Sequence, residues 1–163
     1  MCTPLYQASE KGKLEVVQLL VARGAVVDAR TEGGWTSLMV TSEKGHAPVV
    51  RALLAAGADI RARNNRSCTA LHIASHFGRT EALRELLKSH DAELNAQDND
   101  GGTPLMKACA KGHLMAAMLL IAFGADVNLL DNAGWSPLAY ARSLPKSKSQ
   151  QTLVALLEEH GAH

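Results

Sequence analysis

The chain has 163 residues, the size of one ordinary domain, and 47% of them are apolar while 20% are charged, which excludes a disordered chain. Its net charge of +1 argues against nucleic-acid binding driven by bulk electrostatic attraction. Only 4% of the residues are aromatic, so the core must consist mainly of Leu, Ala and Val, which favours closely packed small helices.

A short motif of Thr or Ser, one variable residue and Leu recurs along the chain at spacings of 33, 33, 34 and 33 residues. Its copies are Thr3-Pro4-Leu5, Thr36-Ser37-Leu38, Thr69-Ala70-Leu71, Thr103-Pro104-Leu105 and Ser136-Pro137-Leu138. A fixed period of this length predicts a solenoid of stacked repeats that form one domain. The units are expected at about residues 1–30, 31–63, 64–97, 98–130 and 131–163.

Each unit is expected to hold two short helices and a projecting loop. The Thr or Ser caps the first helix, and a recurrent glycine such as Gly12 or Gly45 ends it in the left-handed conformation. Paired residues such as Val16-Val17 lie in the second helix, with both members predicted on one face. A turn segment such as Asp98-Asn99-Asp100-Gly101 forms the tip of an extended hairpin. Helices this short must stack on neighbouring units to be stable.

The units at the two ends are expected to act as caps, so that the chain is a complete set of repeats. The first unit has no preceding hairpin, and its polar side chains are expected to face solvent: Glu10, Lys11, Lys13 and Glu15. The fifth unit has Pro145 in place of the recurrent glycine and a four-residue insertion within residues 144–151. Its last helix, at about residues 149–160, is predicted to expose Glu158 and Glu159.

The third unit departs most from the common pattern. It has His90-Asp91 where other units have Gly-Ala, and it contains a one-residue insertion within residues 89–93. We therefore expect this loop to be irregular and more mobile than its surroundings.

Together these motifs resemble the ankyrin repeat. The family signature, Asp/Asn-x-x-Gly-x-Thr-Pro-Leu-His-x-Ala followed by Gly-His, Val-Val, Leu-Leu and Gly-Ala-Asp-Val-Asn, is matched best over residues 98–128. The resemblance covers essentially the whole chain. It implies an all-α ankyrin-repeat solenoid of about five helix-turn-helix units with projecting β-hairpin loops. It also implies a non-enzymatic protein that binds other proteins.

In this family, residues at the hairpin tips and on the concave face of the first helices make the contacts to partners. Phe77 stands where Lys11, Lys44 and Lys111 stand in other units, and exposed aromatic residues often dominate binding energy. For the two tryptophans, packing on the next hairpin is an equal alternative. The predicted partner-binding residues are Trp35, Glu43, Lys44, Arg66, His76, Phe77, Asp100, Lys111 and Trp135.

The charged residues of the loops are distributed unevenly. A basic cluster at Arg61, Arg63 and Arg66 precedes an acidic one at Asp91, Glu93, Asp98 and Asp100. This order predicts a dipolar edge that would orient a partner, and an ordinary solvated surface is the alternative.

The fourth unit carries apolar residues where other second helices carry charged or polar ones. Met115, Met118 and Phe123, with Ala122 among them, predict an apolar stripe on the convex face. The stripe would serve a secondary contact, including weak self-association. The alternative is a monomer in which the stripe is partly shielded.

A metal site is the only chemical alternative in the sequence. Cys68, His72 and His76 stand at intervals of four residues, but a structural zinc needs four converging ligands and no fourth is evident. His72 also stands at the family's Thr-Pro-Leu-His position, where the ring satisfies backbone groups. We therefore expect no metal, no cofactor and no catalytic residue. His46 and His113 are predicted to make structural hydrogen bonds rather than to act as pH switches.

The cysteines and the apolar segments indicate the cellular compartment of the protein. Three cysteines without Cys-x-x-Cys spacing favour reduced thiols, and the longest apolar run, residues 114–123, is too short to span a bilayer. A cytoplasmic protein is expected, with the nucleus as an alternative and no membrane contact.

The predicted function is a scaffold or adaptor, and the alternative is a small inhibitor that blocks an enzyme or its activator. Asn95 and Asn128, at the family's hairpin asparagine, are expected to be turn residues, with hydroxylation as an alternative.

Overall fold

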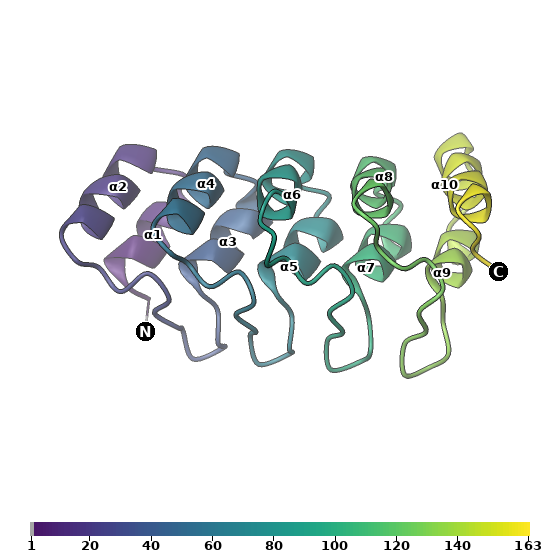
Figure 1. The fold of residues 1–163 in the computed structure, drawn as a ribbon, viewed down its shortest axis with the longest axis horizontal. Helices are drawn as coiled ribbons and strands as arrows, with labels where there is room; N and C mark the ends of the chain where they lie inside the picture. Colours follow the sequence, from purple (N-terminus) through teal and green to yellow (C-terminus); the bar gives the residue numbers. More distant parts are fainter. Residues whose placement is uncertain (1) are drawn as a thin grey trace.

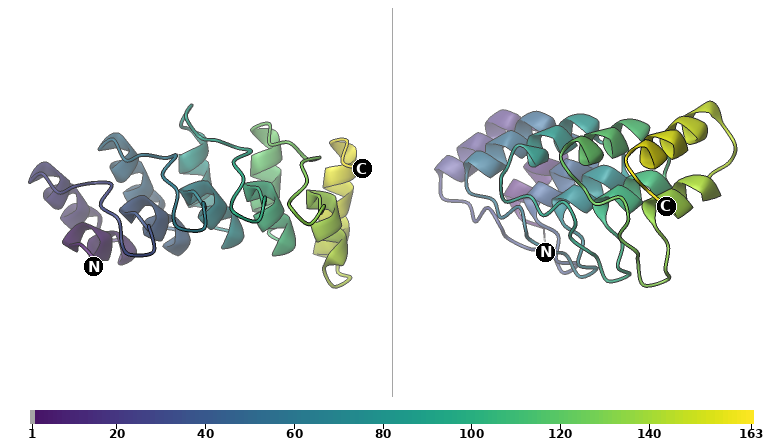
Figure 2. Two further views of the ribbon diagram at one scale, coloured as in Figure 1. Left: turned by 90° about the horizontal axis from the view of Figure 1, so that it is seen from below. Right: turned by 45° about the vertical axis from the view of Figure 1, so that its right-hand side comes forward.

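The computed structural model describes residues 2–163, and within that range the chain forms ten α-helices in two layers (Figure 1). The inner helices are α1 (Pro4–Glu10), α3 (Ser37–Lys44), α5 (Ala70–His76), α7 (Pro104–Ala110) and α9 (Pro137–Ser143). The outer helices are α2 (Leu14–Ala22), α4 (Ala47–Ala55), α6 (Thr80–Leu87), α8 (Leu114–Ala122) and α10 (Lys148–Glu159). The two rows run side by side along the molecule, and the loops project beyond the inner row (Figure 2). The predicted all-α solenoid of five helix pairs is confirmed, with Met1 of the first predicted unit outside the described residues.

The predicted caps begin the inner helices. The hydroxyl of Thr3 accepts a hydrogen bond from the backbone N–H of Tyr6 at 3.1 Å, and that of Ser136 accepts one from Ala139 at 3.2 Å. Each bond satisfies one of the N–H groups that the first turn of a helix leaves without an intrahelical partner. The local sequence therefore determines where the first helix of each unit begins.

The recurrent glycine after an inner helix has two structural reasons. Gly12 has a φ of +65°, and a Cβ atom there would lie 2.8 Å from the ring of His46 in the next unit. The Nε2 atom of His46 in turn bonds the carbonyl of Glu10 at 3.1 Å. His113 repeats this contact two units further on, with the carbonyl of His76 at 3.0 Å. The predicted structural role of these two histidines is confirmed.

The projecting loops are hairpins without paired strands. Each is closed by two backbone bonds, as from the N–H of Asp98 to the carbonyl of Gly102 at 3.1 Å and from the N–H of Gly101 to the carbonyl of Asp98 at 2.9 Å, and residues 2–163 contain no assigned β-strand. Neighbouring loops bond to each other instead, since the N–H of Asn132 donates to the carbonyl of Asp100 at 3.0 Å. Gly101 lies at this junction with a φ of +78°, and a Cβ there would meet Asn132 at 2.6 Å. The loops therefore form a continuous edge along the array.

The paired apolar residues of the outer helices do not all share one face. Val49 and Val50 are both buried in α4, which packs between α2 and α6. In α2 only Val17 is buried, while Val16 is 45% exposed. Adjacent residues of a helix point about 100° apart, so both are covered only where the helix has a neighbour on each side. The prediction that both members of a pair share one face is therefore wrong for Val16 and Val17, whereas Lys11, Lys13 and Glu15 are exposed as expected.

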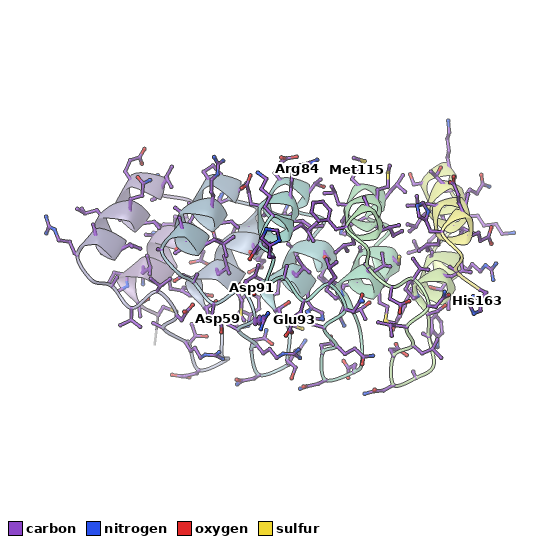
Figure 3. The ribbon with its side chains drawn as sticks, viewed as in Figure 1. Asp59, Arg84, Asp91, Glu93, Met115 and His163 are labelled. Atoms are coloured by element: carbon purple, nitrogen blue, oxygen red, sulfur yellow. The ribbon has the colours of Figure 1, made fainter. Side chains whose placement is uncertain are left out.

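The loop after α6 is irregular, as predicted, with a bend and two turns in place of the Gly-Ala connection of other units. Asp91 pairs with Arg61 at 3.1 Å, and Glu93 pairs with Arg63 at 3.1 Å. Figure 3 labels the two acidic residues. The acidic cluster thus neutralises part of the basic cluster of the preceding unit. Because 30 positions separate the partners of each pair, they lie opposite each other across one repeat, and the predicted dipolar edge stays a prediction.

The mobility of this loop remains a prediction. We expect the amides of residues 89–93 to exchange with solvent faster than those at the ends of α4 and α8, because surface ion pairs contribute only about 0–1 kcal/mol each. Hydrogen exchange measured by NMR tests it. Slower exchange in the loop than at these helix ends would contradict the expectation.

The last unit ends as predicted. α10 buries Leu153 and Leu157 and exposes Glu158 and Glu159. Among the helices of residues 2–163, none combines the length and the apolar character needed to cross a membrane.

Candidate functional site

The largest concentration of predicted binding residues surrounds one pocket of about 370 Å³ between the loops and the inner helices. It lies where the second, third and fourth units meet, and α5 forms its central wall. Six of the nine residues predicted from the sequence line it: Trp35, Glu43, Arg66, His76, Phe77 and Asp100. We call it the Phe77 pocket.

Phe77 is the exposed apolar side chain of this pocket. It caps the C-terminal end of α5, is 40% exposed, and packs edge to face on His76 with ring centroids 4.9 Å apart. The equivalent Lys44 and Lys111 carry charges at the ends of α3 and α7. The third unit therefore offers an apolar anchor point where its neighbours offer ammonium groups.

An ion pair forms the opposite side of the pocket. Lys107 Nζ lies 2.5 Å from Asp98 Oδ2, and Asp98 Oδ1 accepts the N–H of Gly102 at 2.8 Å. Burial raises the pKa of Asp98, but these hydrogen bonds and the charge of Lys107 outweigh it and hold the pKa below its usual value. Asp98 and Lys107 are thus a fixed polar wall. They were not predicted as site residues, since neither departs from a loop or helix position in a way that signals a pocket.

Cys68 lies beside this wall as a protonated thiol. Its Sγ is 3.7 Å from Asp98 Oδ2, and burial together with the charge of Asp98 raises its pKa to about 11. A nucleophilic cysteine needs a lowered pKa, so this environment does not activate the thiol.

The ring of His72 is occupied by backbone and hydroxyl groups. The N–H of Thr69 donates to Nδ1 at 3.2 Å, and Nε2 donates to the carbonyl of Gly102 at 3.1 Å. Neither nitrogen is therefore available to a metal. Within residues 2–163, no three His, Cys, Asp or Glu side chains are placed to hold a metal ion. The candidate set of Cys68, His72 and His76 therefore does not form such a group.

The two tryptophans are not equivalent. Trp35 is half-buried, packs against the core and lines the Phe77 pocket. Trp135 is exposed and lies on Tyr140, with ring centroids 5.2 Å apart. The loop of the third unit lies beside Trp35, whereas in the described chain no further loop follows Trp135. A contact of either tryptophan with a partner stays a prediction.

Lys44, Lys111 and Trp135 lie outside the lining of the pocket. Lys44 and Lys111 are exposed at the ends of α3 and α7, and Lys44 lies 3.5 Å from Glu43. They border the inner row of helices on either side of Phe77. A partner that fills the pocket would reach them only by continuing along the inner face.

The predicted convex stripe is exposed. Met115, Met118 and Phe123 remain 54%, 42% and 45% accessible. Figure 3 shows Met115, like Arg84, at the edge farthest from the loops. Phe123 also lines a second hollow with Leu94 and residues 87–90 and 92. The stripe therefore exists as an apolar surface, and its use in a contact stays a prediction.

The sequence has relatives of the same repeat type. Residues 5–98 and 71–163 match the family model described as "Ankyrin repeats (3 copies)". The chain is 42% identical over 72 residues, 43% of its length, to the putative ankyrin repeat protein YahD of Escherichia coli, and 42% identical over 55 residues, 34% of its length, to human ankyrin repeat domain-containing protein 63. It is also 44% identical over 54 residues, 33% of its length, to mouse protein phosphatase 1 regulatory subunit 12A. These matches span 36%, 14% and 5% of the three relatives.

Proposed function

Because the chain belongs to the ankyrin repeat family, whose repeats generally act as protein–protein interaction modules, we propose that it is a scaffold or adaptor that binds a protein partner through the Phe77 pocket. The observation that carries this proposal is the exposed phenyl ring of Phe77 inside a pocket with charged walls. An apolar anchor surrounded by polar groups is the common arrangement of a binding hot spot.

The bound partner segment would lie along the inner face. Its apolar side chain would pack on Phe77 and Trp35, and its polar groups would meet Glu43, Arg66 and Asp100 at the walls. The pocket of about 370 Å³ is large enough for a side chain but not for a folded domain. A loop or an extended segment therefore fits best.

Phe77→Lys tests this proposal. Lysine occupies the same position in three other units, so the fold tolerates it, while the apolar anchor is lost. Binding to a partner captured by the immobilised chain is expected to weaken by about 30-fold or more, the scale of a hot-spot residue. Calorimetry or surface plasmon resonance with the purified partner measures it.

Phe123→Lys is the matched control. Phe123 is 45% exposed and also caps the end of a helix, but it lies on the convex side of α8. Its replacement is expected to leave the affinity unchanged. Equal losses in the two variants, or an unchanged affinity for Phe77→Lys, would exclude the Phe77 pocket as the binding site.

The second candidate function is a small inhibitor of an enzyme. The likeness to a relative named as a regulatory subunit of protein phosphatase 1 favours it, although the match covers only 5% of that protein. If the captured partner is an enzyme, titration of the chain into its assay separates the two functions. A dose-dependent loss of activity supports an inhibitor, and unchanged activity supports a scaffold.

A further inference from the structure

Asn64 brings to the Phe77 pocket a buried hydrogen-bond donor that the rest of the described chain does not use. The residue lines the pocket and is only 8% exposed. Its Oδ1 atom accepts the backbone N–H groups of Arg66 at 2.9 Å and of Cys68 at 3.0 Å. Only the oxygen of an amide can accept these two donors, so the orientation of the side chain is fixed. Within residues 2–163 its Nδ2 group has no hydrogen-bond partner and is available to a ligand.

The other repeats show where this donor points. Asp98 and Asp131 stand at the same position in the next two units, and each uses one carboxylate oxygen to accept two N–H groups of its own loop. The second oxygen meets a side chain of the following inner helix, which is Lys107 at 2.5 Å in one unit and Tyr140 at 2.6 Å in the other. The third unit has Ile73 at that position of the helix, and an apolar side chain cannot pair with an amide. Because Ile73 itself lines the pocket, the unused donor faces the pocket.

Arg66 adds a second donor to the same pocket. It follows Asn64 by two residues in the loop, is exposed, and lines the pocket. Within residues 2–163 its guanidinium group forms no ion pair, whereas Lys107, the other cation of the lining, is held by Asp98. A guanidinium group matches the two oxygens of a carboxylate, and a neighbouring amide donor can bind one of them. The loop of the third unit therefore carries the donors that a carboxylate requires.

The acidic side chains of the pocket leave this place open to a carboxylate. Asp98 is already paired with a lysine, and Glu43 lies 3.5 Å from Lys44. Asp100 is the remaining acid of the lining, and it stands one unit later at the position of Arg66. The two loops thus present opposite charges at the pocket. A carboxylate of a ligand is attracted to the loop with Arg66 and repelled from the loop with Asp100.

From these observations we propose that the Phe77 pocket takes an acidic side chain of the partner, Asp or Glu, held by Asn64 Nδ2 and the guanidinium group of Arg66. This inference rests on the proposed binding of a protein segment through the pocket, and it names the chemistry of that segment. An apolar side chain near the acid packs on Phe77. Asn64 determines which partner side chain is accepted, because a donor at this place binds a carboxylate and a charged acceptor repels it.

Short random peptides selected on the immobilised chain provide the probes for this proposal. The selected peptides that lose binding to the Phe77→Lys variant are expected to carry Asp or Glu near an apolar residue. Exchanging this acid for its amide, Glu→Gln or Asp→Asn within the peptide, is expected to weaken binding to the wild type about 10-fold, because charge-assisted hydrogen bonds become neutral ones. Calorimetry measures the loss. This exchange tests the acid on the unaltered chain, independently of how any variant folds.

Asn64→Asp tests the assigned donor. Aspartate fills this position in the fourth and fifth units, so the variant keeps the bonds within the loop and replaces the donor by a charged acceptor. Its affinity for the acidic peptide is expected to fall about 100-fold, since a hydrogen bond is lost and a like charge is added. The affinity for the amide peptide is expected to change far less, because an amide can donate to the new carboxylate. In NMR spectra of the wild type, the side-chain NH2 signals of Asn64 are expected to shift when the acidic peptide is added.

Gln18→Glu is the matched control, since it adds the same charge at an exposed position of α2 outside the lining of the pocket. It is expected to leave both affinities unchanged. Peptides that need Phe77 but carry no acid, or equal losses of both peptides in Asn64→Asp, would overturn this inference and leave the proposed function intact. Peptides that bind Phe77→Lys as well as the wild type would contradict the proposed function too. Circular dichroism compares the fold of Asn64→Asp with that of the wild type.

Discussion

Leu86→Ala is expected to lower the free energy of unfolding by about 2–5 kcal/mol, which is the usual cost of removing a fully buried leucine side chain. Leu86 is 0% exposed in α6, and α6 packs between α4 and α8. The cavity would lie in the middle of the array, where each unit contacts only its neighbours. The coupling between the two halves of the solenoid is expected to weaken as well. Urea unfolding followed by circular dichroism measures both, as a lower midpoint and a shallower transition.

Leu20→Ala is the matched control for this prediction. It removes the same atoms at the same position of the repeat, but Leu20 is only half-buried because α2 has no outer helix on its N-terminal side. Its loss of unfolding free energy is expected to stay near or below about 2 kcal/mol. Equal losses in the two variants would show that the first unit is packed as tightly as the interior.

The helices could be predicted from the sequence because the signals for their ends are local. Thr3 and Ser136 act as caps through bonds to residues three positions later, and Gly12 ends a helix through its own positive φ. No tertiary information is needed for such contacts. The recurrence of each signal at nearly the same spacing then placed all five units in register.

The burial of Val16 could not be predicted in the same way. Its residue type and its position in the unit match those of Val49, yet Val16 is 45% exposed and Val49 is 1% exposed. The difference depends on how many helices flank each outer helix. A sequence period describes one unit and contains no information on what covers the end of the array.

The ion pairs between the basic and acidic clusters could have been predicted from the repeat period. Arg61 and Asp91 stand 30 residues apart, close to one period, and the structure joins them at 3.1 Å. Comparing the sequence with itself after a shift of one unit would have paired them. A list of charges in chain order instead suggested separate basic and acidic regions.

The lining of the Phe77 pocket was predicted only in part for a similar reason. Phe77 was found because it departs from the lysine of other units, and such a departure is visible in the sequence. The pairing of Asp98 with Lys107 was not predicted, because their contact at 2.5 Å joins a loop to the helix that follows it. Position in the repeat identifies residues that face the pocket, but the pairing of their side chains depends on the folded loop.

Acidification from pH 7 to about pH 4 is expected to destabilise the protein through His72. Burial lowers the pKa of its imidazole to about 4, although the carbonyl of Gly102 and the charge of Asp98 both favour the protonated ring. Protonation would place a second donor on Nδ1, opposite the N–H of Thr69 that now donates to it. The folded protein therefore resists the proton that the unfolded chain accepts near its usual pKa of about 6.5.

The sign of the effect follows from the proton balance. Between about pH 6.5 and pH 4 the unfolded state binds more protons at this residue, so the free energy of unfolding rises with pH across that window. The contribution of His72 to the free energy of unfolding is complete above about pH 6.5 and lost as the pH falls toward 4, with a magnitude of up to about 3 kcal/mol.

Urea unfolding at several pH values measures this contribution. His72→Gln is the control, because its amide can donate to the carbonyl of Gly102 but does not titrate. The difference between the two pH curves therefore reports His72 together with Asp98, whose charge interacts with the ring. Parallel curves would show that the ring does not govern stability in this range.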